Sequence, residues 1–122
     1  MKPSAILESA LYVTDLDEAE RFYSDVLGLP LITKVPGRHA FFRCGQGVLL
    51  LFVAETTKIP PEPEARLPVP PHGATGEGHL CFAATADELE AWRKRLGETG
   101  IEIEAEVEWP NGGRSIYLRD PS

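Results

Sequence analysis

The sequence predicts an α+β fold built from one unit that occurs twice in a chain of 122 residues. Each copy starts with a β-like stretch, continues into a helix-like stretch and then reaches a glycine. Glu8 and His79 occupy matching places in the two opening stretches, 71 positions apart, and Gly28 and Gly100 follow the two helical stretches, 72 positions apart. Self-similarity at a fixed spacing is typical of a repeated supersecondary unit. A chain of this length can bury one core, so a single domain is expected.

The first copy opens with a strand over residues 6–13, where apolar and polar positions alternate. One face carries Leu7, Leu11 and Val13, and the other carries Glu8, Ala10 and Tyr12. Asp15 and Glu18 then predict a capping box at the start of a helix. Apolar residues recur at helical spacing as far as Gly28, which predicts the end of that helix.

Three strands are expected next, over residues 29–34, His39–Cys44 and 48–54. The turn sequences Pro36-Gly37 and Gly45-Gln46-Gly47 separate them, so they should form hairpins. Residues 5–54 therefore form a first module of strand, helix and three strands. Six prolines interrupt the following segment, 55–76, which predicts an extended connector or flap.

The second module, residues 77–122, repeats this order. A strand is expected over 78–84, with Leu80 and Phe82 on the face that a helix would cover. Thr85 and Glu88 predict a second capping box, followed by a helix. Strands over 101–109 and 114–119 should flank a tight turn at Asn111-Gly112-Gly113. The repeat requires one more strand, expected beyond Ser122.

The composition narrows the classes of partner. A net charge of −7 argues against binding a nucleic-acid backbone. No apolar run approaches the ~20 residues of a membrane span, and the N-terminus lacks the apolar region of a signal peptide. We therefore predict a cytoplasmic protein without a nucleic-acid or membrane partner. Cys44 and Cys81 are expected to be reduced thiols packed in the core.

Glu8 and His79 are the first candidates for a functional site. Alternation places both on the face opposite the bulky apolar residues, so they would point into a cavity between two curved sheets. A carboxylate and an imidazole suit Fe²⁺, Mn²⁺, Ni²⁺, Co²⁺ or Zn²⁺ better than Ca²⁺. Taken singly, a glutamate near a strand edge is usually solvated, and a lone histidine is usually a core or surface residue with a structural role. Their matching positions favour a shared metal site.

Further candidates are substrate-binding residues on the same predicted face. Strand parity groups His39, Phe41 and Arg43, and the arginine could bind an anionic group. Apolar or stacking walls could come from Tyr12, Phe52 and Trp109, although strand aromatics are often simply core. His72 in the connector could close over a ligand, whereas Cys81 is interpreted as packing.

The segments Leu11-Tyr-Val-Thr-Asp-Leu16, Arg21-Phe-Tyr23 and Val26-Leu-Gly-Leu29 resemble the opening of the vicinal oxygen chelate superfamily. Gly78-His79-Leu-Cys-Phe82 and Tyr117-Leu-Arg-Asp-Pro121 are similar to its second-half strand and closing motif. The superfamily includes glyoxalases, bleomycin-resistance proteins and extradiol dioxygenases. The resemblance implies tandem βαβββ modules around an open cavity, and a homodimer whose site can draw residues from two chains.

It also implies metal ligands on the first and last strands of each module, which gives Glu8 and His79. Three departures from the pattern follow. Glu8 stands where histidine is usual, so a centre of two histidines and one carboxylate is not supported. Leu50 occupies a ligand position and cannot ligate, and the remaining ligand is expected beyond Ser122.

Three functions remain open on this basis. The first is a divalent-metal enzyme of lyase, isomerase or dioxygenase type that acts on a small oxygen-rich substrate, with Glu8 as a ligand or as a catalytic base. The second is a metal-free module of the bleomycin-resistance type that binds a small molecule. The third is an interaction domain that keeps only the fold.

Overall fold

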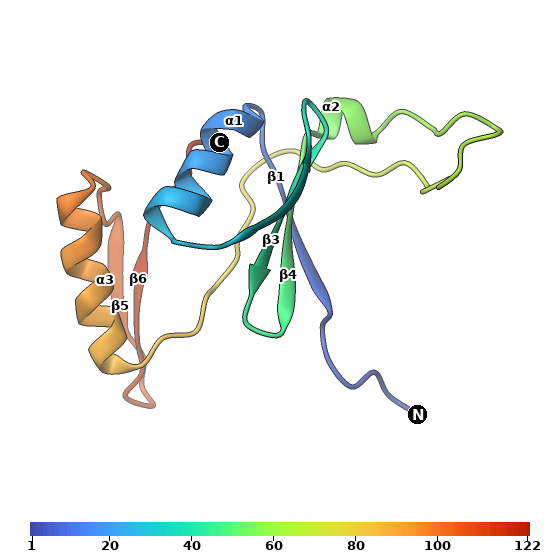
Figure 1. The fold of residues 1–122 in the computed structure, drawn as a ribbon. Helices are drawn as coiled ribbons and strands as arrows, with labels where there is room; N and C mark the ends of the chain where they lie inside the picture. Colours follow the sequence, from blue (N-terminus) through green and yellow to red (C-terminus); the bar gives the residue numbers. More distant parts are fainter. The chain divides into compact units, whose positions relative to one another are not determined.

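The computed structural model describes all residues from Met1 to Ser122, which form two compact units (Figure 1). The first unit contains Met1–Leu80 together with Pro121–Ser122, and the second contains Cys81–Asp120. The fold is α+β with one sheet in each unit, as the sequence predicts. None of its helices is both long and apolar enough to span a membrane.

The sheet of the first unit has four strands in the order β1-β4-β3-β2. Strand β1 (Glu8–Tyr12) runs parallel to β4, whereas β2 (Leu31–Val35), β3 (His39–Cys44) and β4 (Gly47–Phe52) form antiparallel hairpins. The two predicted turns join them, with positive φ at Gly37 and Gly45. The predicted order of strand, helix and three strands is therefore confirmed for this unit.

The helical segment between β1 and β2 begins at the predicted cap residue, but only half of the predicted capping box forms. The Asp15 side chain accepts a hydrogen bond from the Glu18 amide, 3.0 Å away, and α1 (Leu16–Arg21) follows. A wider π-helical turn, η1 (Phe22–Val26), replaces the continuous α-helix that the periodicity indicates. Its Leu27 amide bonds to the Phe22 carbonyl, five residues back, and the segment ends at Gly28, where φ is 74°. Apolar periodicity alone does not distinguish these two helix types.

The core of this unit lies between the helical segment and one face of the sheet. Ala40 and Phe42 of β3 and Leu49 and Leu51 of β4 are all at most 2% exposed. Alternate residues on the same strands point to the opposite side, which we call the open face. Leu7 was expected on the covered side but is 70% exposed, because it precedes β1 and has no helix above it.

The connector begins with a short helix, α2 (Ala54–Thr57), where the sequence predicts the end of a strand. Thr57 is 1% exposed, and its hydroxyl donates to the His72 carbonyl at 2.7 Å. The His72 amide in turn donates to the Thr57 carbonyl at 3.0 Å. These two bonds close the base of a proline-rich loop, the 57–72 loop. The flap predicted here therefore has a fixed base.

The second unit consists of α3 (Ala86–Glu98) and a hairpin of β5 (Ala105–Glu108) and β6 (Arg114–Tyr117). The predicted capping box is present, since the Thr85 amide donates to the Glu88 side chain at 2.9 Å and the Glu88 amide donates to the Thr85 hydroxyl at 3.2 Å. The hairpin turns at Gly112, where φ is 90°. An ion pair of 2.6 Å between Arg93 and Glu106 joins the helix to the hairpin.

The predicted strand over residues 78–84 is absent from the structure. In the first unit, β1 is a strand because it pairs with β4, and no strand pairs with residues 78–84. Phe82, expected to be covered, is 40% exposed. Both cysteines are free, but Cys81 is exposed and Cys44 only half-buried, so the expectation of core thiols is wrong.

Candidate functional site

The register of the sheet gathers most of the candidate residues on the open face. Strands β1, β4 and β3 lie side by side, and residues opposite one another across them share a face. Three successive rows result, running from the start of β1 to its end. They are Glu8, Val48 and Arg43, then Ala10, Leu50 and Phe41, then Tyr12, Phe52 and His39.

The third row is the centre of an aromatic cluster formed by five residues: Tyr12, His39, Phe41, Phe52 and His72. The rings of His39 and Phe41 are stacked, with centroids 4.2 Å apart. Phe52 meets the Phe41 and His72 rings edge-on, at 5.8 and 4.5 Å. All five side chains are half-buried, so the cluster is an apolar surface that keeps some access to solvent.

His72 joins this cluster from the 57–72 loop. Its Nδ1 atom lies 2.7 Å from the Tyr12 hydroxyl, within hydrogen-bond distance. The loop thus places one imidazole beside the aromatic residues of the sheet. Sequence reasoning gave His72 little weight, because a histidine among prolines carries no periodicity. It did not identify Thr57, whose two bonds to His72 fix the position of that histidine.

His39 lies in an environment that disfavours its charged form. Partial burial lowers the pKa of this imidazole below its ordinary value, and the positive charge of Arg38 lowers it further. The lowered pKa favours the neutral imidazole, in which one ring nitrogen accepts a hydrogen bond. A neutral imidazole stacked on Phe41 suits a planar or apolar ligand better than an anion.

The first row places opposite charges at its two ends. Glu8 is exposed, and the structure records no hydrogen bond or ion pair from its carboxylate. Arg43 is also exposed, and its guanidinium donates to the Gly47 carbonyl at 3.3 Å. The two residues flank Val48 on neighbouring strands, so their backbones lie about 10 Å apart. A small polar molecule could contact both side chains.

His79 is exposed and lies in the extended segment that follows the connector. A Cβ atom added at Gly78 would lie 3.6 Å from a methyl group of Leu11, whose side chain is on the face of β1 opposite Glu8. The structure therefore does not bring His79 and Glu8 together on the open face. The types of donor in Glu8 and His79 fit a divalent transition metal. Two ligands do not complete a metal site, and no group of three or more His, Cys, Asp or Glu side chains is positioned to hold a metal.

Two other candidate residues, Leu50 and Trp109, make well-defined contacts in the structure. Leu50 is 8% exposed at the centre of the open face, between Ala10 and Phe41, and adds an apolar contact there. Trp109 belongs to the second unit, where its indole nitrogen donates to the Ser115 hydroxyl at 2.9 Å and the residue is 44% exposed. That bond anchors the turn of the β5–β6 hairpin.

Comparisons with known proteins agree with this architecture. A lactoylglutathione lyase from Agrobacterium tumefaciens is 46% identical, with a TM-score of 0.90 over 99% of this chain and 89% of its own. A virulence protein from Salmonella typhimurium is 29% identical, with a TM-score of 0.69 over 99% of this chain and 91% of its own. The fosfomycin resistance protein FosX from Listeria monocytogenes shares the fold at 19% identity, with a TM-score of 0.68 over 98% of this chain and 87% of its own.

The family described as the Glyoxalase/Bleomycin resistance protein/Dioxygenase superfamily matches residues 5–122. That range includes the whole second unit, all but the first four residues of the first unit, and every candidate residue of the open face. The resemblance found in the sequence motifs is therefore confirmed over nearly the whole chain. The protein belongs to the glyoxalase, bleomycin-resistance and dioxygenase superfamily, which is the vicinal oxygen chelate superfamily.

Proposed function

We propose that this protein is a glyoxalase-type enzyme that acts on a small oxygen-rich substrate bound on the open face. The reaction would be of the lyase, isomerase or dioxygenase type, and the 46% identity to a lactoylglutathione lyase supports the first of these. The observation that carries the proposal is the unpaired Glu8 carboxylate, on the same sheet face as Arg43 and the aromatic cluster. Such a face offers a base, a cation and apolar contacts together.

Each group of candidate residues has a distinct task in this proposal. The aromatic cluster and Leu50 would bind the apolar part of the substrate, and Arg43 would hold an anionic group. Glu8 and His79 would supply two ligands for a divalent metal, which would polarise adjacent substrate oxygens. If Glu8 is not a ligand, its carboxylate would act as the base that removes a proton beside a carbonyl. A homodimer in the cytoplasm is part of the same proposal.

Metal analysis of the purified protein tests this assignment. One equivalent of Mn²⁺, Fe²⁺, Co²⁺, Ni²⁺ or Zn²⁺ per chain is expected, and Glu8→Ala and His79→Ala should each lower metal affinity by about tenfold or more. Glu62→Ala is the matched control, because Glu62 is an exposed carboxylate in the 57–72 loop. Unchanged metal content in both site variants would refute the ligand assignment. Glu8→Gln then tests the base, since its loss of activity should exceed any loss of metal.

A metal-free module that binds a small molecule is the second candidate. It is favoured by Leu50 at the centre of the open face, and by the absence of any group of three ligands. This function predicts ligand binding that a chelator does not affect but that Phe41→Ala and Phe52→Ala weaken. If the protein is a metal-dependent enzyme, the chelator should weaken ligand binding. Calorimetric titration with and without the chelator separates the two.

A further inference from the structure

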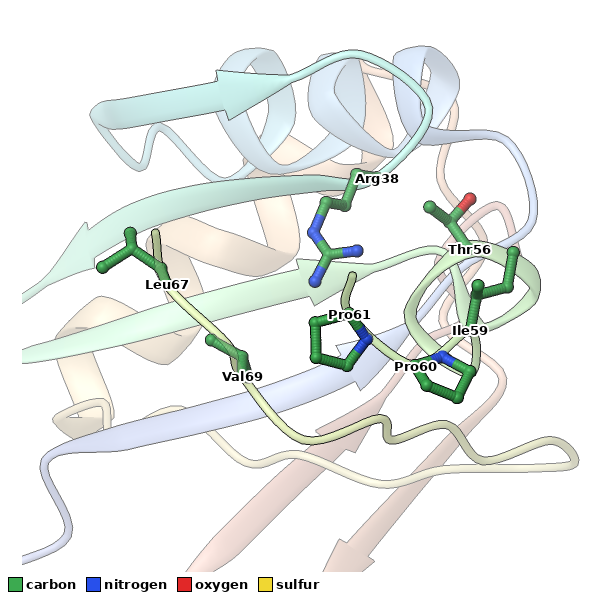
Figure 2. A pocket seen from close by; sticks show the side chains of 7 residues that line it. All are labelled: Arg38, Thr56, Ile59, Pro60, Pro61, Leu67 and Val69. Carbon is green, nitrogen blue, oxygen red and sulfur yellow. The ribbon is translucent and has the colours of Figure 1, made fainter. Parts of the chain in front are cut away.

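A pocket of about 350 Å³ lies between the β2–β3 turn and the 57–72 loop (Figure 2). It is distinct from the candidate residues of the open face, none of which lines it. The volume is at the lower end of the range for small-molecule sites in proteins. Its seven lining residues are Arg38, Thr56, Ile59, Pro60, Pro61, Leu67 and Val69.

Arg38 contributes the only charge in this pocket. Its guanidinium extends into the space beside Pro61, as Figure 2 shows, and no carboxylate forms an ion pair with it. The protein carries 19 acidic and 12 basic residues, so carboxylates are plentiful, and nearby Lys58 pairs with Glu55 at 2.6 Å. An arginine fork without a carboxylate partner is available for a bidentate contact with an external anion.

Five of the six other lining residues have apolar side chains. Ile59 is 62% exposed, Leu67 is 72% and Val69 is 50%, so a molecule seated here would remove much apolar surface from water. Thr56 provides the remaining hydroxyl, which already donates to the Gly37 carbonyl at 2.8 Å. The pocket therefore combines one cationic side chain with five apolar side chains, and polar backbone atoms also contribute to its surface.

The base of the loop limits how far these walls can separate. Thr57 and His72 are joined by two hydrogen bonds, and Thr56 and Ile59 lie within two residues of Thr57. The prolines at 60 and 61 restrict the backbone that follows. The lining is thus partly organised before any ligand binds, which lowers the entropic cost of binding.

We propose that this pocket binds a small monocarboxylate with an apolar body, held by a bidentate contact from Arg38 and by the apolar side chains of the 57–72 loop. A carboxylate matches the planar guanidinium, and a single anionic group matches the single charge in the lining. The apolar body would contact Ile59, Leu67 and Val69. The site is separate from the proposed catalytic face, so it does not depend on that function.

Phenylacetate is a suitable probe, with phenylacetamide as its neutral analogue of nearly the same shape. Titration of the full chain, followed by NMR, should shift the methyl signals of Ile59, Leu67 and Val69 in a saturable way. The amide analogue should bind about tenfold more weakly or worse, because it cannot form the charge-assisted pair. Arg38→Gln should weaken phenylacetate binding by a similar factor, and Arg38→Lys by less.

Arg66→Gln is the matched control, because Arg66 is an exposed arginine of the same loop that does not line the pocket. It should leave phenylacetate binding unchanged, and the methyl spectrum of each variant checks that the fold is intact. Three results would overturn the proposal. They are equal binding of the two probes, equal loss in the Arg66 and Arg38 variants, and saturable shifts confined to the ring signals of Tyr12, His39 and Phe41, recorded in the same titration. The absence of any shift at about 10 mM phenylacetate would overturn it as well.

Discussion

At the scale of single residues, the contact between Tyr12 and His72 ties the 57–72 loop to the sheet. Tyr12→Phe removes a hydrogen bond of 2.7 Å and leaves Nδ1 of a half-buried histidine without that partner. We expect a loss of about 1 kcal/mol in the free energy of unfolding, measured by denaturant titration. His72→Phe keeps a ring beside Phe52, and the double variant completes a thermodynamic cycle. Strictly additive losses would contradict a direct bond between the two side chains.

His39 gives the second prediction at this scale. Its pKa is lower in the folded protein than in the unfolded chain, mainly because of burial and then because of Arg38. Its contribution to stability is complete above the unfolded pKa of about 6.5, and is lost as the pH falls from there through the folded pKa. Between about pH 7.5 and pH 5, the unfolding free energy should fall more steeply in the native protein than in His39→Gln. Parallel profiles would show that His39 does not titrate differently on folding.

At the scale of elements, the Thr85 cap is the clearest test of local stability. Thr85→Ala removes the side-chain acceptor at the start of α3, so the free energy of unfolding should fall by about 1 kcal/mol. Thr85→Asn restores an acceptor at the same place and should recover most of that loss. Denaturant titration measures both variants. An equal loss in Thr85→Asn would indicate that backbone conformation matters here more than the cap.

Elements that depend on residues close together in the chain, such as this cap, could be predicted from the sequence. Thr85 and Glu88 are three residues apart, and the turns at Gly37 and Gly45 depend only on their neighbours. Residues 78–84 have an equally suitable strand sequence, yet a strand also needs a partner whose position no local pattern contains. The open face could be predicted from strand parity, whereas the position of His72 could not, since two hydrogen bonds between Thr57 and His72 fix it. Long-range pairing is therefore the part that sequence reasoning did not supply.

At the scale of the whole molecule, the proposed homodimer raises the question of whether the two ligands of one metal site come from one chain or from two. The edge strand β2 exposes three apolar residues, Leu31, Ile32 and Val35, which are compatible with contact to a second copy of the chain. Light scattering coupled to size-exclusion chromatography measures the mass of the particle and so tests the dimer.

A sharper test mixes two inactive variants, Glu8→Ala and His79→Ala, after dissociation and reassociation. If Glu8 and His79 of one site come from different chains, each hybrid dimer regains one complete site. Random reassociation should then restore about a quarter of the native metal content and activity. If both ligands come from one chain, no site is complete in any hybrid and nothing should be regained. Glu62→Ala mixed with His79→Ala is the control, because the Glu62→Ala chains bring intact ligands and activity persists under either arrangement.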